Sequence, residues 1–144
     1  MDEVVTNTMR YTFEYNTKEK FLEVHATGTM DDKAFPEVAR MFWGKLSEND
    51  CWKSLIDYRS FSFTKSTFQI YMRPQIVIDI GGTNRVKMAV LVESIDDVYR
   101  FLETVYYNRG VQIKMFTNSE EAIQWLDYTS NRVAGFLFKP ECLL

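Results

Sequence analysis

The chain has 144 residues, which suits one domain and is too short for two ordinary cores. Hydrophobic residues make up 46% and charged residues 26%, and this composition excludes a disordered or collagen-like chain. The formal net charge is −3, so we expect no nucleic-acid partner, because phosphate neutralisation requires clustered lysine and arginine.

The N-terminal part predicts an antiparallel β-hairpin. Residues 10–15 alternate polar and aromatic side chains, and residues 21–27 are also typical of a strand. Between them, residues 16–19 (Asn-Thr-Lys-Glu) form a turn-forming cluster. Two alternating runs around a short polar turn indicate a hairpin, and Gly28 is expected to end its second strand.

A helix is predicted next. Its apolar residues recur at three- and four-residue spacing, which is typical of a helix that buries one stripe: Phe35, Val38, Ala39, Phe42 and Leu46. Pro36 is tolerated only in the first turn, so the helix should begin near residues 32–36 and end near residues 48–50. Residues 52–58 predict a third strand that leads into a polar and aromatic segment at 59–63.

Residues 64–80 carry two patterns. Aromatic and apolar positions such as Phe68 and Met72 fit a helix, whereas Pro74 should kink it and residues 75–78 would suit a strand. We expect a helix through most of this stretch, because the crossover to the next parallel strand needs one. The state of residues 74–80 stays open between helix and strand.

The second half predicts two strand–helix units. Residues 86–92 are almost continuously apolar, as in an interior strand that is covered on both faces. A helix should follow from a cap at residues 94–97 to Arg109, with Gly110 as its C-terminal cap. Residues 111–116 predict the fifth strand. The last helix should open near Asn118 and bury Ala122, Ile123 and Leu126.

This order of elements predicts an α/β fold. We expect a five-stranded, mixed and largely parallel sheet with an N-terminal β-hairpin, packed by four helices in a single domain over residues 1–130. Residues 131–144 form an apolar tail. Such a tail should dock, either on its own domain or on a neighbouring subunit, and from it we expect a homodimer.

Three segments carry a resemblance to a known family: residues 54–59 (Ser-Leu-Ile-Asp-Tyr-Arg), residues 85–92, and residues 116–126 with Glu-Ala-Ile-Gln-Trp-Leu. With the spacing between them they resemble the STAS domain in its SpoIIAA-like branch, which includes anti-sigma-factor antagonists and STAS/Sec14-like proteins. The likeness extends over about residues 10–128.

The resemblance implies a non-enzymatic regulatory module. Such domains act by protein–protein interaction with a regulatory kinase or an anti-sigma-like protein, and some bind a nucleotide or another small ligand. In the anti-sigma-factor antagonists, a serine or threonine at the start of the helix after the third strand is phosphorylated. The corresponding segment here is residues 60–67, and it lacks the Asp-Ser-Ser-Gly-type signature.

The hydroxyl-bearing residues of this segment are the first candidate site. A helix N-terminus has free N–H groups and favours anions, so a phosphate here would alter a docked interface. The alternative is ordinary helix capping by one of the hydroxyls. The candidates for interaction or phosphorylation are Ser60, Ser62, Thr64 and Ser66.

A second candidate is a ligand pocket. Asp57 and Arg59 share a strand face, so they either pair structurally or mark a ligand site at the strand ends. Aromatic residues nearby either pack in the core or line an apolar cavity for a small molecule or lipid. The residues assigned to this pocket are Asp57, Arg59, Phe63, Phe68 and Met72.

Catalysis is the least favoured function. His25 is the single histidine, and Cys51 and Cys142 have no partner at metal-ligand spacing. We therefore expect no catalytic residue, no metal and no cofactor. No signal peptide or membrane-spanning run is seen in the sequence, so we expect a cytoplasmic protein without stable membrane insertion. The leading hypothesis is a regulatory module, and the alternative is a carrier of a small apolar ligand.

Overall fold

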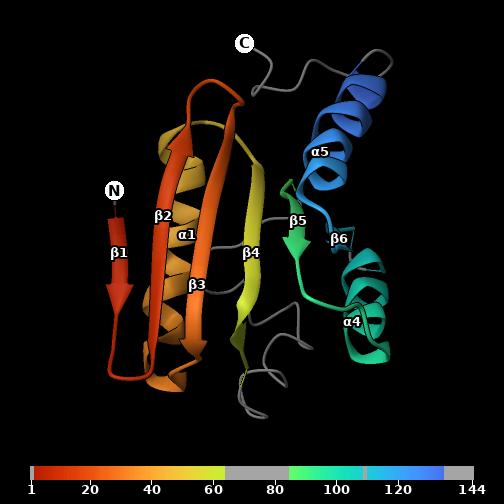
Figure 1. Cartoon of the computed structure of the whole chain (residues 1–144). Coiled ribbons are helices and arrows are strands. Elements are labelled where there is room, and N and C mark those ends of the chain that lie inside the picture. The colour runs from red at the N-terminus through yellow and green to blue at the C-terminus, as the bar shows by residue number, and fades with distance from the viewer. Residues whose placement is uncertain (1, 64–84, 109, 135–144) are drawn as a thin grey trace.

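The structure is a computed structural model, and it describes residues 2–63, 85–108 and 110–134. In this part of the chain, one sheet contains six strands: β1 (Asp2–Val5), β2 (Met9–Asn16), β3 (Phe21–Thr29), β4 (Lys53–Ser62), β5 (Lys87–Leu91) and β6 (Gln112–Phe116). The helices are the short 3₁₀ helix η1 (Asp32–Ala34) and the α-helices α1 (Phe35–Glu48), α4 (Asp97–Tyr107) and α5 (Ser119–Ala134) (Figure 1).

The strands lie in the sheet in the same order as in the chain. β1, β2 and β3 pair antiparallel, whereas β3, β4, β5 and β6 pair parallel. The α/β class, the mixed sheet and the β2–β3 hairpin are therefore confirmed. The expected number of five strands is wrong by one, because β1 adds an edge strand that buries Val4 and pairs Asp2 with Lys45 of α1.

Three of the four predicted helices fall within the described residues. α1, α4 and α5 confirm three of the four, and α5 continues through residue 130, where the predicted domain ends. The fourth helix, at residues 64–80, lies outside the described residues, as do residues 135–144 of the apolar tail.

The helices cover opposite faces of the sheet. The larger apolar cluster joins one face of the sheet to α1 and α4, through residues such as Val38, Phe42 and Leu102. A smaller cluster joins the other face to α5, through Ala122 and Leu126. α1 lies behind β2 and β3, and α5 lies beside β5 and β6 (Figure 1). On the α5 face, polar residues of β2 and β3 such as Glu14 and His25 are exposed.

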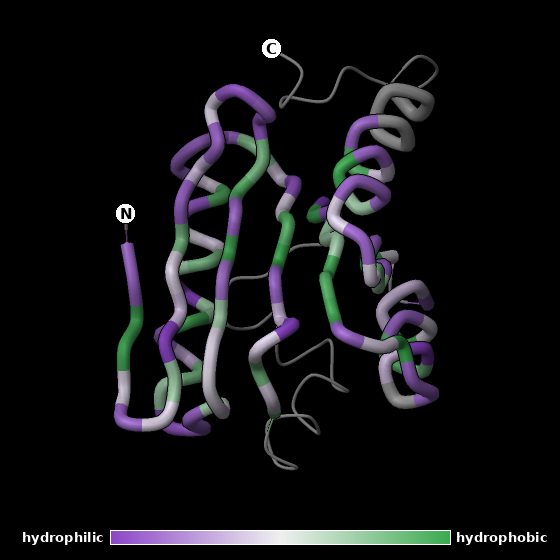
Figure 2. The backbone as a smooth tube through the Cα atoms, in the orientation of Figure 1, coloured by the Kyte–Doolittle hydropathy of each residue, from purple (hydrophilic) through white to green (hydrophobic). Residues whose placement is uncertain are grey.

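Hydropathy along the strands accounts for this layering. β5 is buried along its whole length, and after Lys87 it continues as a hydrophobic segment between both layers (Figure 2). β2 instead alternates, and it buries Met9, Tyr11 and Phe13 while Arg10 and Glu14 are exposed. The sequence of a strand with one solvated face alternates between apolar and polar residues, whereas the sequence of a strand covered on both faces is a continuous apolar run.

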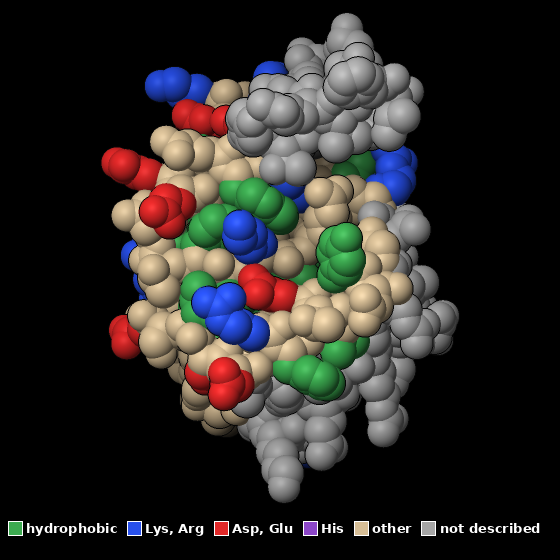
Figure 3. All heavy atoms as spheres, turned by 90° about the vertical axis from the view of Figure 1, so that its right-hand side faces the viewer, with side chains coloured by type: hydrophobic (Ala, Val, Ile, Leu, Met, Phe, Trp, Pro, Cys, Tyr) green, Lys and Arg blue, Asp and Glu red, His purple; other side chains and the backbone are tan. Residues whose placement is uncertain are grey.

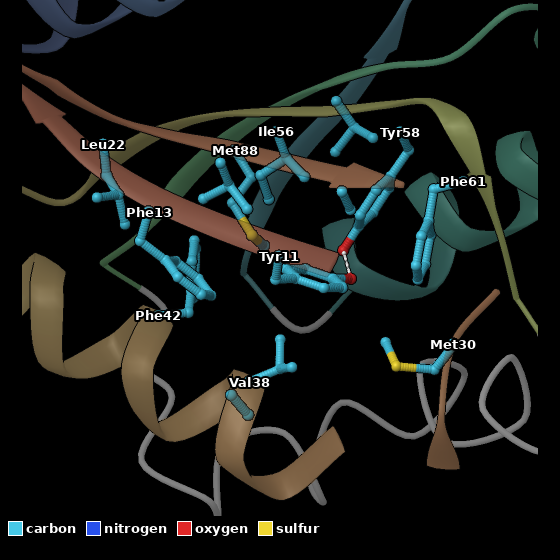
Figure 4. Close-up of a cluster of buried hydrophobic side chains, with 14 of the residues drawn as sticks. Tyr11, Phe13, Leu22, Met30, Val38, Phe42, Ile56, Tyr58, Phe61 and Met88 are labelled. Carbon is cyan, nitrogen blue, oxygen red and sulfur yellow. Dashed lines mark hydrogen bonds between the residues drawn. The ribbon is translucent and has the colours of Figure 1, made fainter. Parts of the chain in front are cut away.

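The centre of the larger cluster is aromatic. Tyr11 from β2 and Tyr58 and Phe61 from β4 point toward one another above α1 (Figure 4). The ring centroids of Tyr11 and Phe61 lie 5.2 Å apart, as do those of Tyr58 and Phe61. Edge-to-face and stacked contacts of this kind add to the stabilisation that ring burial provides.

β4 contains a bulge before its C-terminal end. His25 pairs with Asp57 but Thr27 pairs with Ser60, so β4 carries one residue more than β3 between these pairs. Arg59 and Ser60 are consecutively exposed, while Tyr58 and Phe61 are both buried. The bulge therefore keeps the aromatic residues inward and places a basic residue and a hydroxyl together outside.

Candidate functional site

The candidate site is a group of polar residues, all exposed except the half-buried Asp57, at the C-terminal ends of β3 and β4, which we call the strand-end cluster. It consists of Asp57, Arg59, Ser60 and Ser62 from β4 and His25, Thr27 and Thr29 from β3. His25 pairs with Asp57, Thr27 with Ser60 and Thr29 with Ser62. Carboxyl ends of parallel strands are a common place for ligands in open α/β sheets.

An ion pair organises the first part of the cluster. Arg59 donates from Nε to Asp57 Oδ1 at 3.0 Å and from a terminal nitrogen to Oδ2 at 2.8 Å. Its backbone N–H also donates to Oδ1 at 3.0 Å. The hydrogen bonds from Arg59 hold the pKa of Asp57 below its ordinary value, although partial burial opposes this. Asp57 therefore stays ionised and fixes the guanidinium.

His25 extends this arrangement onto β3. Its Nδ1 lies 3.5 Å from Asp57 Oδ2, and its side chain is 60% exposed. Asp57 thus lies between an imidazole and a guanidinium, while its own side chain is only 17% exposed. Asp57 and Arg59 do pair with each other, which was one of the two alternatives that the sequence left open.

The hydroxyl groups form the second part of the cluster. Thr29 Oγ1 and Ser62 Oγ lie 3.0 Å apart, and both residues are exposed. The backbone carbonyl of Ser62 accepts from Met30 N–H at 2.9 Å, which ties the end of β4 to the chain after β3. The C-terminal ends of β3 and β4 therefore carry two serines and two threonines in register.

The secondary structure around the serines differs from the prediction. Ser60 and Ser62 lie within β4, not in a loop or at a helix start, because β4 continues to Ser62 by pairing with the last residues of β3. The helix-dipole argument for an anion therefore does not apply to these two residues. The candidates Thr64 and Ser66 lie outside the described residues.

The predicted pocket residues do not form one site. Phe63 lines a cavity of about 70 Å³ between the sheet, α1 and α4. The walls include Tyr11, Tyr58, Tyr99 and Tyr106, and aliphatic residues of both layers complete them. Asp57 and Arg59 point to the opposite face of the sheet from Tyr58, because neighbouring strand residues alternate between faces. Phe68 and Met72 lie outside the described residues.

Two residues of the cluster, Thr27 and Thr29, were missed in the sequence, and so was the contact of His25 with Asp57. Gly28 was taken as the end of a strand, whereas β3 runs on to Thr29. The spacing of three between Tyr58 and Phe61 was the available signal, since a regular strand would place aromatic residues of one face two apart.

The chemistry available at the cluster is recognition and hydroxyl modification. Among the described residues, no group of three or more metal-binding side chains is found. Within the same part of the chain, no helix is both long and apolar enough to cross a membrane.

On the side of the molecule where α4 and α5 lie, acidic and basic side chains alternate with hydrophobic ones, and they form no patch of a single charge (Figure 3).

Comparison with known proteins identifies the fold. No known family model matches the chain, and no curated protein matches it in sequence. A DUF3478-family protein from Shewanella loihica PV-4, described as having a SpoIIAA-like fold, superposes with a TM-score of 0.56 at 13% identity, over 85% of this chain and 98% of that one. The anti-sigma factor antagonist SpoIIAA in its unphosphorylated form gives 0.48 at 13% identity, over 88% and 98%. The first comparison shows a SpoIIAA-like fold for this chain, as the resemblance to STAS domains implied.

Proposed function

We propose that this SpoIIAA-like domain is a non-catalytic regulatory module that acts by protein–protein contact at the strand-end cluster. The partner would be a regulatory protein such as a kinase or an anti-sigma-like protein. The observation that carries the proposal is the register of exposed hydroxyls beside the Asp57–Arg59 ion pair, at the ends of two central strands. We further propose a cytoplasmic location and a homodimer.

The residues of the cluster suit recognition better than catalysis. The guanidinium of Arg59 is already held by Asp57 in two hydrogen bonds, so it offers a fixed donor surface with little loss of side-chain freedom on binding. His25 is the single histidine of the chain, and its Nδ1 is directed to Asp57. A partner with acceptor groups opposite Arg59 and the four hydroxyls would complement this surface.

Phosphorylation of Ser60 or Ser62 would regulate such a contact. A phosphate group adds about −1.5 to −2 charges and three acceptor oxygens. On an exposed strand end next to Asp57, this charge would compete for Arg59 and change the surface that a partner meets. Both serines are exposed and therefore open to a modifying enzyme.

Affinity capture from the native cells tests the proposal. The wild-type chain is compared with Ser62→Glu and with the matched control Thr104→Glu, which places the same charge on an exposed position of α4. We expect a protein that is retained by the wild type and by the control but is reduced at least tenfold with Ser62→Glu. Equal capture by all three, or no specific partner of the wild type, would refute the proposal.

The apolar cavity supports a second candidate function, the binding of a small apolar ligand. The cavity is lined by aromatic and aliphatic side chains and measures about 70 Å³. An apolar cavity of about 150 Å³ holds one benzene molecule, so this one suits a group of a few heavy atoms more than a whole lipid. Native mass spectrometry of freshly purified protein separates the two functions. Additional mass on the chain supports the ligand, and bare protein supports the regulatory module.

A further inference from the structure

Two lysines lie side by side beneath helix α5. Lys53 of β4 and Lys87 of β5 are direct partners in the parallel ladder. Only 4% of Lys53 and 3% of Lys87 is exposed. Lysine is almost never buried to this degree without a paired charge, so the groups that surround these two ammonium groups decide how they behave.

Lys87 is held by neutral groups of α5. Its Nζ donates to the backbone carbonyl of Leu126 at 3.0 Å and to that of Trp125. The same nitrogen lies 4.4 Å from the centroid of the Trp125 ring. These contacts fix the helix over the strand, but carbonyl and ring dipoles compensate a buried full charge less well than a carboxylate does.

The charged groups around Lys87 do not balance within the described residues. Lys53 faces Lys87 from β4, and Asp127 faces both lysines from α5. The Oδ1 atom of Asp127 lies 3.6 Å from Lys53 Nζ, and 48% of the Asp127 side chain is exposed. From β6, the direct partner Gln112 is neutral and Lys114 lies over the Phe116 ring. Among the described side chains, these two cations therefore share one half-exposed carboxylate.

This imbalance changes the proton affinity of Lys87. Burial, with the positive charge of Lys53 as the second cause, lowers the pKa of Lys87 from 10.5 to about 7, and Asp127 opposes the shift only in part. At neutral pH the residue is thus near its titration midpoint while α5 is in place.

The rest of the α5 contact is small as far as the side chains of residues 119–127 are described. Among the described side chains, the cluster that joins α5 to the sheet is separate from the larger core on the opposite face, and its buried residues are Phe21, Ala89, Leu91, Phe116, Ala122 and Leu126, with Leu55, Ile123 and Trp125 partly buried against them. An element held by few buried apolar contacts opens with a lower free energy than the elements of the main core. Its attachment is therefore sensitive to a single buried charge.

We infer that Lys53 and Lys87 make the docking of α5 on the sheet sensitive to pH: a proton on Lys87 weakens the contact of the helix with the sheet, and loss of that proton strengthens it. When α5 detaches, Lys87 becomes exposed to water and regains a pKa near 10.4. Between about pH 7 and pH 10 the form with α5 detached therefore holds more protons than the form with α5 docked. Each rise of one pH unit in this window favours the docked form about tenfold, and below about pH 7 the dependence ends.

Hydrogen exchange of the full chain, followed by mass spectrometry from pH 6 to pH 9, tests this inference. Protection of α5 amides is taken relative to that of β2 and β3, which removes global unfolding and intrinsic exchange from the comparison. We expect this ratio to rise about tenfold per pH unit above pH 7 in the wild type and to stay constant in Lys87→Met. The control Lys114→Met, which alters an exposed lysine of the neighbouring strand, should follow the wild type.

A second variant keeps the test decisive if Lys87→Met does not fold. Lys53→Met removes the neighbouring charge, so Lys87 should bind its proton more firmly and the rise in α5 protection should begin at higher pH. NMR titration of the Lys87 side chain in the same variant should show the matching upward shift. A wild-type ratio that does not change with pH, or an equal pH dependence in wild type and Lys87→Met, would overturn the inference.

Discussion

The hydroxyl groups of Tyr11 and Tyr58 lie 2.8 Å apart inside the apolar layer between the sheet and α1. The two residues are 47 positions apart in the chain and come from β2 and β4, with β3 between their strands. A hydrogen bond between polar groups that are both buried ties these strands together across the central one.

This pair predicts energetic coupling. Tyr11→Phe and Tyr58→Phe should each lower the free energy of unfolding by about 1 kcal/mol, because each removes a partner of a buried hydrogen bond. The double variant should lose less than the sum of the two, since it leaves neither hydroxyl of the pair behind. Urea denaturation of the four proteins measures the coupling, and strictly additive losses would contradict it.

Two glycines should respond to alanine in opposite ways. Gly28 has a φ of +92°, and a Cβ there would lie 2.1 Å from the backbone oxygen of Thr8, so Gly28→Ala should destabilise the protein by about 2 kcal/mol or more. Gly44 lies in α1 with open space around its Cβ position. Gly44→Ala should therefore stabilise by about 0.5–1 kcal/mol. Thermal melting of both variants checks the contrast.

The ion pair of Asp57 predicts a dependence of stability on acid. The folded-state pKa of Asp57 is lowered, so its contribution is complete above the unfolded value of about 3.9 and is lost as the pH falls through the lower folded value. Asp57→Asn should therefore cost about 1–3 kcal/mol at pH 7. The difference from wild type should shrink toward pH 2.

Urea titrations of wild type and Asp57→Asn at several pH values measure this effect. Glu14→Gln, which changes an exposed carboxylate on β2, is the matched control. A wild-type advantage that stays the same from pH 7 to pH 2 would show that the charge of Asp57 is not its source.

Glu103 should protect the edge of the sheet. Its Oε2 accepts from the backbone N–H of Met115 at 2.7 Å, on β6, which ends the sheet in the described part of the chain. Exposed edge donors promote pairing with other chains. Glu103→Ala should cost about 1 kcal/mol and increase self-association. Light scattering over a concentration series checks this, with Glu121→Ala on the exposed side of α5 as the control.

Elements with strong local periodicity were predictable from sequence. α1 was expected to begin near residues 32–36 and end near 48–50, and it spans Phe35–Glu48. β5 was expected from its apolar run and spans Lys87–Leu91. In both cases the burial pattern follows from neighbours in the chain, which is the information that a single sequence contains.

Features set by distant pairing were not predictable. β1 has only four residues and a single buried side chain, Val4, so its sequence carries little alternation. The last residues of β3 and β4 are strands because they pair with each other, not because either segment has strong strand character. The strand-end cluster was therefore found only in part, and its β3 residues were missed.

The bulge in β4 has a consequence for insertions and deletions in this strand. If the strand kept all its residues but had no bulge, strict alternation from Asp57 onward would turn Ser60 and Ser62 inward and Phe61 outward. A chain that lacks Arg59 would need no irregularity at all, since its aromatic residues would already fall two apart. Such a shortened strand should keep its hydrophobic side intact, but it would lose the guanidinium. The irregular backbone of β4 therefore accommodates Arg59, the one arginine of this strand, without disturbing the buried aromatic residues.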